Sequence, residues 1–106
     1  MYIVVFVTAS GQPEAEKIAR HLLEQKLAAC VNIIGGLTSL YWWEGKIDQS
    51  QEALLVIKTK KSLFKKLAAA VKSFHSYSVP EIIALPIVDG QKDYLNWIGA
   101  SLGKGK

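Results

Sequence analysis

Residues Leu37 to Thr59 read LTSLYWWEGKIDQSQEALLVIKT, two β-favouring runs on either side of a short polar break, Glu44-Gly45-Lys46. A glycine inside such a break predicts a β-hairpin. Its second arm, Ile47 to Thr59, would span roughly 40 Å at about 3.3 Å per residue. A compact chain of this length has a radius of gyration of only about 13 Å. We therefore expect the hairpin to extend beyond the body of its own domain.

Three adjacent aromatic residues, Tyr41, Trp42 and Trp43, lie near the tip of this hairpin. Because side chains alternate along a strand, Trp42 faces one side while Tyr41 and Trp43 face the other. Apolar side chains on an overhanging arm are typical of a contact surface, so we predict a subunit interface here. The alternative is a hairpin that curls back over its own core.

The chain before the hairpin alternates strand and helix. Tyr2 to Thr8 is an unbroken apolar run, which predicts a strand buried on both faces in the middle of a sheet. Pro13 suits the first turn of a helix, whose apolar stripe continues to about Lys26. Ala28 to Ile34 is a second strand pattern, and Gly35-Gly36 after it predicts a bulge before the hairpin arm resumes.

After the hairpin, Ser62 is positioned to cap a second amphipathic helix that ends near His75. Val79 to Val88 is strand-like but contains two prolines, which cannot donate to a ladder, so we expect it at a sheet edge. Asp93 to Leu102 predicts a short C-terminal helix, and Gly103 to Lys106 are expected to fray.

The order strand, helix, strand, strand, helix, strand predicts a ferredoxin-like α+β sandwich with a long central hairpin, built as one domain over residues 1–106. Both helices lie on the same sheet face in this topology, and the other face stays uncovered. Copies of the same chain are the simplest cover. A head-to-tail contact between them could close into a ring.

Half of the residues are apolar, and the single cysteine, Cys30, excludes an intrachain disulfide and favours a reducing compartment. We find no secretory signal pattern and no segment apolar for long enough to span a membrane, so we expect a cytoplasmic protein. Six lysines lie between Lys58 and Lys72, with no acid from Ala53 to Pro80. They form either an anion-attracting patch or a solvated helix surface.

Few side chains are suited to chemistry. Cys30 and His75 are the softer metal donors, but neither they nor the carboxylates show metal-ligand spacing, and no common catalytic motif is present. Cys30 also fits a small buried hydrophobe, and His75 also fits a helix-end cation that interacts with the helix dipole. Tyr77 either packs or directs its hydroxyl into the same cleft. These patterns favour no enzymatic class.

Four segments together carry a family resemblance: EQKLAACVNIIGGLTSLYWWEGK, LLVIKT, HSYSVPEIIALPI and DYLNW. In this combination the chain resembles the CutA divalent-ion tolerance family from Tyr2 to Leu102. The resemblance implies a ferredoxin-like subunit in a tight homotrimer, cytoplasmic in bacteria. It also implies a role in tolerance of copper and other divalent cations, without an established enzymatic reaction.

By position, the resemblance implies a site near the subunit clefts made of Cys30, Lys58, His75, Tyr77, Glu81 and Trp97. Ser76 and Ser78 stand where members commonly carry a proline and an acid or amide. Val7 and Phe74 stand where some members have a cysteine and a histidine. Only His75 remains of that metal-donor set, so we expect copper or another divalent cation to bind weakly.

The leading hypothesis is a non-enzymatic homotrimer that binds a divalent metal or a small ligand weakly at intersubunit clefts. The alternative is an RNA-binding ferredoxin-like module that uses the basic cluster from Lys58 to Lys72. RNA-binding members of this fold stack bases on aromatic residues of the open sheet face. Here that face is expected to be aliphatic apart from Tyr2 and Phe6, so nucleic acid is not the expected partner.

Overall fold

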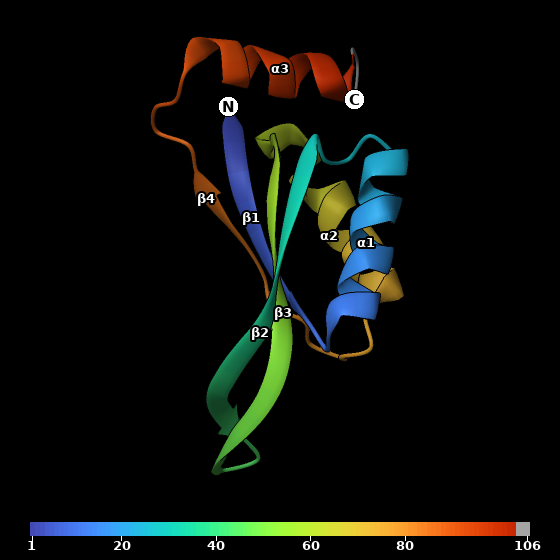
Figure 1. Ribbon diagram of the computed structural model, residues 1–106, viewed down its shortest axis with the longest axis vertical. Coiled ribbons are helices and arrows are strands. Elements are labelled where there is room, and N and C mark those ends of the chain that lie inside the picture. The colour runs from blue at the N-terminus through green and yellow to red at the C-terminus, as the bar shows by residue number, and fades with distance from the viewer. Residues whose placement is uncertain (104–106) are drawn as a thin grey trace.

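Four antiparallel strands form one sheet in the order β2-β3-β1-β4 in the computed structural model, which describes residues 1–103. The strands are β1 (Tyr2–Ala9), β2 (Cys30–Trp43), β3 (Lys46–Lys60) and β4 (Ile82–Pro86). The helices are α1 (Gln12–Glu24), the 3-10 turn η1 (Lys61–Leu63), α2 (Phe64–Phe74) and α3 (Lys92–Leu102). This is the ferredoxin-like α+β arrangement that the sequence predicted (Figure 1). The fraying expected of residues 104–106 lies outside the described part.

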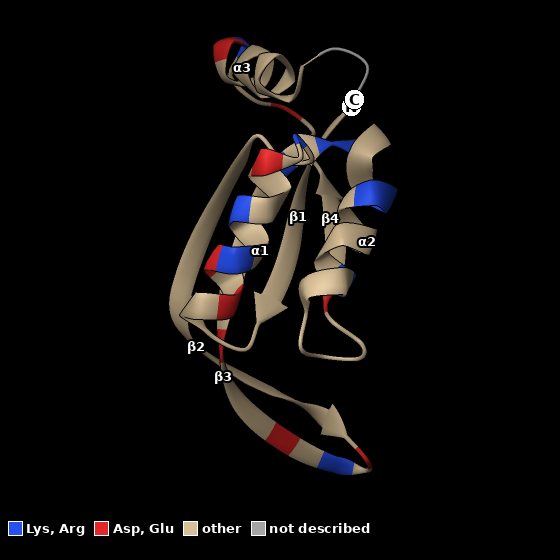
Figure 2. Ribbon diagram, turned by 90° about the vertical axis from the view of Figure 1, so that its right-hand side faces the viewer, with Lys and Arg blue, Asp and Glu red and all other residues tan. Residues whose placement is uncertain are grey.

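Helices α1 and α2 cover one face of the sheet (Figures 1 and 2). The core beneath them combines alternate residues of β1 and β3 with the apolar stripes of both helices: Ile3, Val5, Val7, Leu55, Ile57, Ile18, Leu22, Leu67 and Val71. Helix α3 lies across the end of the sheet where β1 begins, and it buries Ile98 and Leu102 against Leu63 and Tyr2. Within residues 1–103, none of these helices has the length and apolarity needed to cross a membrane.

The opposite face of the sheet is open. Along β1, the odd-numbered residues from Ile3 to Ala9 are buried under the helices, whereas Tyr2, Val4 and Phe6 are only partly buried. The prediction that this strand is buried on both faces is therefore wrong for a single chain, because α1 and α2 both lie on one side. The apolar sequence of β1 leaves a partly exposed apolar surface on the open face.

Strand β4 is an edge strand, as its prolines predicted, but it is shorter than expected. Its pairing with β1 runs only from Ile82 to Pro86, whereas the predicted strand ran from Val79 to Val88. The paired residues begin at Ile82, after Pro80, and beyond Pro86 the backbone N–H of Ile87 still donates a 3.1 Å hydrogen bond to the oxygen of Tyr2.

The start of α2 also differs from the prediction. Ser62 lies inside the 3-10 turn η1, and Leu63 occupies the N-cap position of the helix. A leucine side chain has no oxygen with which to accept a hydrogen bond from the first turn. The helix therefore begins by a tightened backbone turn instead of a serine cap.

The β2-β3 hairpin turns at Glu44-Gly45, which connect the paired residues Trp43 and Lys46. Both turn residues have positive φ, 49° and 79°. This is the requirement of a type I′ turn, whose twist matches that of the flanking strands. The outer half of the hairpin extends beyond the rest of the protein in Figure 1, and the molecule measures 44 Å along its longest axis against 26 and 22 Å. The predicted overhang is confirmed.

A bulge separates the inner and outer halves of β2. Ile34 pairs with Leu54 of β3, but Leu37 pairs with Glu52, so two residues of β2 oppose one residue of β3. The two residues at the bulge are the predicted pair Gly35-Gly36. Gly36 has a φ of 71°, a left-handed conformation that glycine adopts without steric cost.

The bulge changes which residues of β2 share the face of Glu52, from even-numbered residues before it to odd-numbered residues beyond it. Tyr41 and Trp43 pair with Asp48 and Lys46, and all four lie on that face. Trp42 lies on the other face, as alternation predicted. The outer hairpin therefore has one face that combines charged residues with aromatic rings and one that mixes apolar and uncharged polar residues.

Candidate functional site

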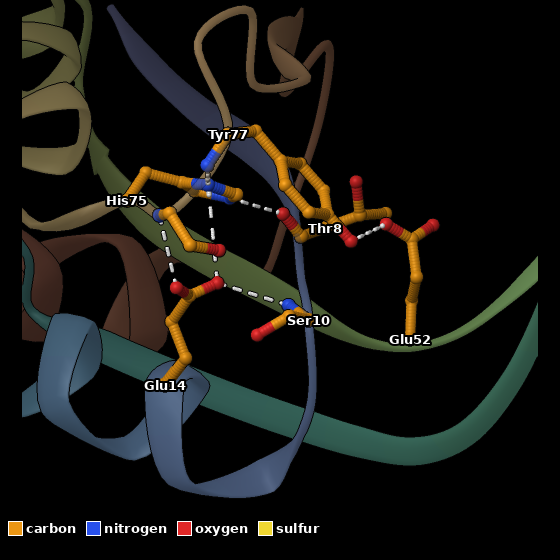
Figure 3. Close-up of polar contacts among 7 residues, drawn as sticks. Thr8, Ser10, Glu14, Glu52, His75 and Tyr77 are labelled. Atoms are coloured by element: carbon orange, nitrogen blue, oxygen red, sulfur yellow. Dashed lines mark hydrogen bonds and ion pairs between the residues drawn. The ribbon is translucent and has the colours of Figure 1, made fainter. Parts of the chain in front are cut away.

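The loop after α2 places His75 at the centre of a buried hydrogen-bond network (Figure 3). Its side chain is fully buried. Nε2 lies 2.6 Å from the backbone oxygen of Thr8, and Nδ1 accepts a 3.0 Å hydrogen bond from the backbone N–H of Tyr77. Because a carbonyl only accepts, Nε2 carries the proton and the ring is neutral. A neutral ring is not the cation that the helix-dipole interpretation of His75 requires.

Glu14, in the first turn of α1, joins the same network. Its carboxylate accepts hydrogen bonds from the backbone N–H groups of Ser10 at 2.9 Å and Ser76 at 3.0 Å, and Oε1 lies 3.8 Å from Nδ1 of His75. Burial alone would raise the pKa of Glu14. The hydrogen bonds from Ser10 and Ser76 hold this pKa below its usual value.

Tyr77 connects the loop to β3 through Glu52. Its hydroxyl donates a 2.8 Å hydrogen bond to Oε2 of Glu52 (Figure 3). Burial, together with the hydrogen bond and negative charge of Glu52, raises the pKa of Tyr77 to about 12. The phenol therefore remains a donor at physiological pH. Glu52 is only 9% exposed, and no buried polar side-chain atom in the described part of the chain lacks a hydrogen-bond partner.

A cavity of about 780 Å³ lies between the outer hairpin and the segment from Tyr77 to Glu81. We refer to it as the hairpin cavity. The residues that line it are Thr8, Ser39, Leu40, Tyr41, Trp42, Trp43, Asp48, Glu52, Tyr77, Ser78, Val79, Pro80 and Glu81. The cavity thus brings two residues of the predicted site, Tyr77 and Glu81, together with the three aromatic residues predicted for the interface.

Three other residues of the predicted site gather under α3 at the other end of the open face. Cys30 pairs with Lys58 across β2 and β3, Lys58 Nζ donates a hydrogen bond to Oδ1 of Asn32, and Cys30 Sγ lies 3.9 Å from the same oxygen. Burial and the neighbouring Cys30 thiol raise the pKa of Tyr94. Trp97 stacks on Tyr94, with ring centroids 5.5 Å apart.

The predicted site residues therefore form two groups instead of one. Cys30 pairs with Lys58 of β3, and Lys58 pairs in turn with Val4 of β1. His75 instead bonds to Thr8, which lies four residues further along β1. Four residues of strand span roughly 13 Å, so the softer metal donors are far apart. In the described part of the chain, no three His, Cys, Asp or Glu side chains are grouped to hold a metal. A single chain does not supply the donor set of a tight divalent-cation site.

Six contributors to these groups were not predicted as site residues: Thr8, Ser10, Glu14, Asn32, Glu52 and Tyr94. Thr8 acts through its backbone oxygen, which no side-chain pattern reveals. An acid in the first helical turn, such as Glu14, is ordinarily explained by the helix dipole. Asn32 could have been found, because it lies two residues from Cys30 and so on the same face of the strand.

The lysine cluster from Lys58 to Lys72 does not form one surface. Lys58 lies on the open face of the sheet, where it binds Asn32. Lys65, Lys66 and Lys72 belong to α2, which covers the opposite face (Figure 2). A nucleic acid strand on one face would therefore meet only part of the cluster.

The fold and these clusters define a class of protein: a ferredoxin-like domain with an extended hairpin and polar groups at both ends of an open sheet face. The model of the CutA1 divalent ion tolerance protein family matches residues 3–101. The chain belongs to this family, which confirms the resemblance drawn from the sequence.

Named relatives agree with this assignment. A divalent-cation tolerance protein CutA from Thermus thermophilus is 48% identical over 100 residues, which cover 94% of this chain and 97% of the relative. The structure of a periplasmic divalent cation tolerance protein CutA from Archaeoglobus fulgidus matches with a TM-score of 0.94 at 44% identity, covering 96% and 99% of the two chains. CutA1 from Oryza sativa matches with a TM-score of 0.92 at 48% identity, covering 94% and 92%. The names of the Thermus and Archaeoglobus proteins refer to cation tolerance, and the RNA-binding alternative gains no support from the three names.

Proposed function

We propose that this chain contributes to divalent-cation tolerance as a non-enzymatic homotrimer, which binds metal or a small ligand weakly at the clefts between its subunits. The observation that carries the proposal is the open apolar sheet face beside an overhanging hairpin, in a chain whose relatives are named for cation tolerance. The names of these relatives state no reaction, and the proposed role needs none.

Association is supported by apolar area that a single chain leaves in water. Ile34, Ile83 and Leu85, on the two edge strands, are 52%, 50% and 45% exposed, and Trp42 on the outer hairpin is 73% exposed. Burial of apolar surface stabilises an assembly by about 25 cal/mol per Å². Contiguous exposed apolar residues of this kind mark contact surfaces.

Three copies are the number that the family resemblance implies. A head-to-tail contact, in which the hairpin of one copy reaches the open face of the next, closes into a ring when the rotation between copies is a simple fraction of a turn. Such a ring would cover Tyr41, Trp42 and Trp43, the residues that we propose for the interface. It would also bring clusters from neighbouring chains together at each boundary.

Metal binding is proposed to be weak because His75 is already engaged. Its Nδ1 lone pair accepts the N–H of Tyr77, so binding copper or another divalent cation there requires the loss of a buried hydrogen bond. Cys30 adds a thiol only for soft ions such as Cu(I), and it lies at the other end of the sheet. Divalent cations would therefore bind reversibly and would not be permanent cofactors of the protein.

A cytoplasmic location is also part of the proposal. Cys30 is a free thiol, which a reducing compartment preserves. The Archaeoglobus relative is described as periplasmic, and the rice and Arabidopsis relatives as chloroplastic. This chain spans about half the length of those two plant relatives, 54% and 53%. Cell fractionation with an antibody against the chain tests the location.

The role in tolerance is tested by growth. A strain that lacks the gene should grow more slowly than its parent in medium with inhibitory Cu(II), and a plasmid that carries the wild-type gene should restore growth. An empty plasmid is the control. Equal growth of the deletion strain and its parent across Cu(II), Zn(II) and Co(II) would contradict the proposed role.

A further inference from the structure

We propose that the exposed side of η1 and α2 is a docking surface for an acidic peptide segment of a partner protein. Four exposed lysines, which we refer to as the basic face, define this surface: Lys61, Lys65, Lys66 and Lys72. Lys65 and Lys72 are seven residues apart, so they lie on the same side of α2, two turns from each other. The sequence left open whether these lysines attract an anion or only keep the helix solvated.

The charges of the basic face are not balanced by acids. No acid occurs from Ala53 to Pro80. Among residues 1–103, the ion pair present joins His75 to Glu14, and none of the four lysines is paired with a carboxylate. Helix surfaces that only serve solubility usually combine both signs in pairs three or four residues apart. The neighbouring helix α1 has both signs, whereas the charged residues of α2 are all lysines (Figure 2).

Two of these lysines are placed where they oppose the stability of the helix. Lys65 and Lys66 lie in the first turn of α2, which contains no acid. The N-terminal end of a helix carries a partial positive charge, so lysines there are unfavourable, whereas Lys72 in the last turn is placed favourably. Residues that break such a local rule without compensation within the fold are expected at functional sites. A partner that neutralises these lysines would supply the compensation.

The basic face remains accessible in the proposed assembly. Helices α1 and α2 lie on one side of the sheet, and the proposed subunit contacts use the open side and the outer hairpin (Figure 1). Each chain therefore presents its basic face to solvent, both as a single chain and in a ring. Cys30 and Lys58 belong to the open side and take no part in this surface.

The composition of the surface favours an acidic peptide over single-stranded nucleic acid or a membrane. The exposed residues between the lysines are short and not aromatic: Ser62, Ala69 and Ser73. Sites for single-stranded nucleic acid combine positive charge with aromatic rings on which bases stack. Phe74, at the end of α2, instead packs against His21 of α1. A flat anionic membrane would also meet Glu16 and Glu24, which are exposed on α1.

The length of the basic face suits a short extended segment. It runs roughly 17 Å from Lys61 to Lys72, at about 1.5 Å per residue. Alternate side chains of an extended peptide point the same way at intervals of about 7 Å. Two or three carboxylates on one side of a segment of about five residues can therefore lie along the lysines. The short side chains between the lysines let the backbone of that segment approach the helix.

The test uses a fluorescein-labelled deca-glutamate peptide, whose fluorescence anisotropy is followed as wild-type protein is added. We expect saturable binding of one peptide per chain at low ionic strength, which weakens as salt screens the lysines. A labelled Gly-Ser peptide of the same length is the uncharged control. Duplex DNA and vesicles that contain phosphatidylserine are titrated under the same conditions. The absence of saturable peptide binding, or tighter binding of DNA or vesicles than of the peptide, would overturn the proposal.

Two matched charge reversals locate the binding. Lys65→Glu and Lys92→Glu make the same change in the first turn of a helix, α2 and α3 respectively. Thermal melts should show that both variants fold and are at least as stable as the wild type, because an acid in the first turn interacts favourably with the helix dipole. Lys65→Glu should weaken peptide binding by about tenfold, and Lys92→Glu by less than about twofold.

Equal weakening by the two reversals would show a response to net charge alone and would overturn the proposed surface. A peptide result of either sign leaves the growth and mass measurements unaffected, so this proposal and the proposed function fail separately.

Discussion

The Nε2 atom of His75 lies 2.6 Å from the backbone oxygen of Thr8, which ties the loop after α2 to the end of β1 across 67 positions of sequence. The same ring accepts the backbone N–H of Tyr77 through Nδ1. One buried imidazole therefore satisfies two backbone groups that belong to separate elements. Its first role in this fold is to fix the loop that forms one wall of the hairpin cavity.

We expect His75→Ala to lower the free energy of unfolding by about 2–4 kcal/mol, because it leaves two buried backbone groups unpaired and removes side-chain volume. His75→Gln keeps a donor and should lose less. Urea denaturation of both variants measures the difference. If His75→Ala were as stable as the wild type, the buried network would have no structural role.

Calorimetric titration with Cu(II) should show only weak binding, because the metal competes with the Tyr77 N–H for the His75 lone pair. His75→Ala should weaken the binding further. A submicromolar affinity that persists in His75→Ala would exclude His75 as the metal ligand and would place the site elsewhere.

A titration with base should detect the raised pKa of the Tyr77 hydroxyl. Its pKa of about 12 lies above the value of about 10 for an unfolded tyrosine, so the folded state holds this proton more tightly. That stabilisation is complete below about pH 10 and disappears as the pH rises through about 12. Tyrosinate absorbance should show that Tyr77→Phe loses a group that titrates late in the wild type. Loss of a group that titrates near the ordinary tyrosine value would show that the Glu52 hydrogen bond does not form in solution.

Acid should destabilise the fold partly by protonating the Glu14 carboxylate. Its lowered pKa means that the folded state favours the carboxylate, which stabilises the fold above the unfolded value of about 4.3. This stabilisation is lost as the pH falls through the folded pKa. The free energy of unfolding of Glu14→Gln should therefore fall less at acid pH than that of the wild type. Glu24→Gln, on the exposed side of α1, should lose as much stability in acid as the wild type. Chemical denaturation between neutral and acid pH compares the two variants.

Assembly is tested by mass. Light scattering of the wild type at low micromolar concentration should report about three times the 11.7 kDa of one chain. Trp42→Glu combined with Trp43→Glu should give an aggregating or partly unfolded chain, because association and folding are coupled. Val88→Glu, at an apolar residue that is 94% exposed and outside the hairpin, is the matched control. A wild-type monomer that melts cooperatively would contradict the proposed trimer.

The sequence predicted the parts of this fold that depend on local pattern. The hairpin, its overhang and the glycine bulge follow from the run Leu37 to Thr59 and the pair before it, because turn chemistry and strand length act over a few residues. The edge position of β4 follows from its prolines for the same reason. The uncovered side of β1 was misjudged, because apolar composition alone does not distinguish burial by a helix from burial by another subunit.

The polar network was harder to predict than the fold. His75 was identified as a candidate, but its neutral state depends on the backbone groups of Thr8 and Tyr77, and only the folded chain brings Thr8 to it. Glu52 was not predicted as a site residue. Its burial beneath Tyr77 arises from the path of the loop after α2, which carries no sequence signature.

The β2 bulge makes the length of this strand as important as its composition. Deletion of Gly35 would leave Gly36 opposite Ala53 and restore one-to-one pairing, while Leu37 would stay opposite Glu52 and Tyr41 opposite Asp48, so the outer hairpin would keep its faces. A one-residue deletion nearer the turn would also be absorbed at the bulge, but the residues between the deletion and the bulge would then change faces. The bulge therefore allows the hairpin to lose one residue, at a cost that depends on where the residue is lost.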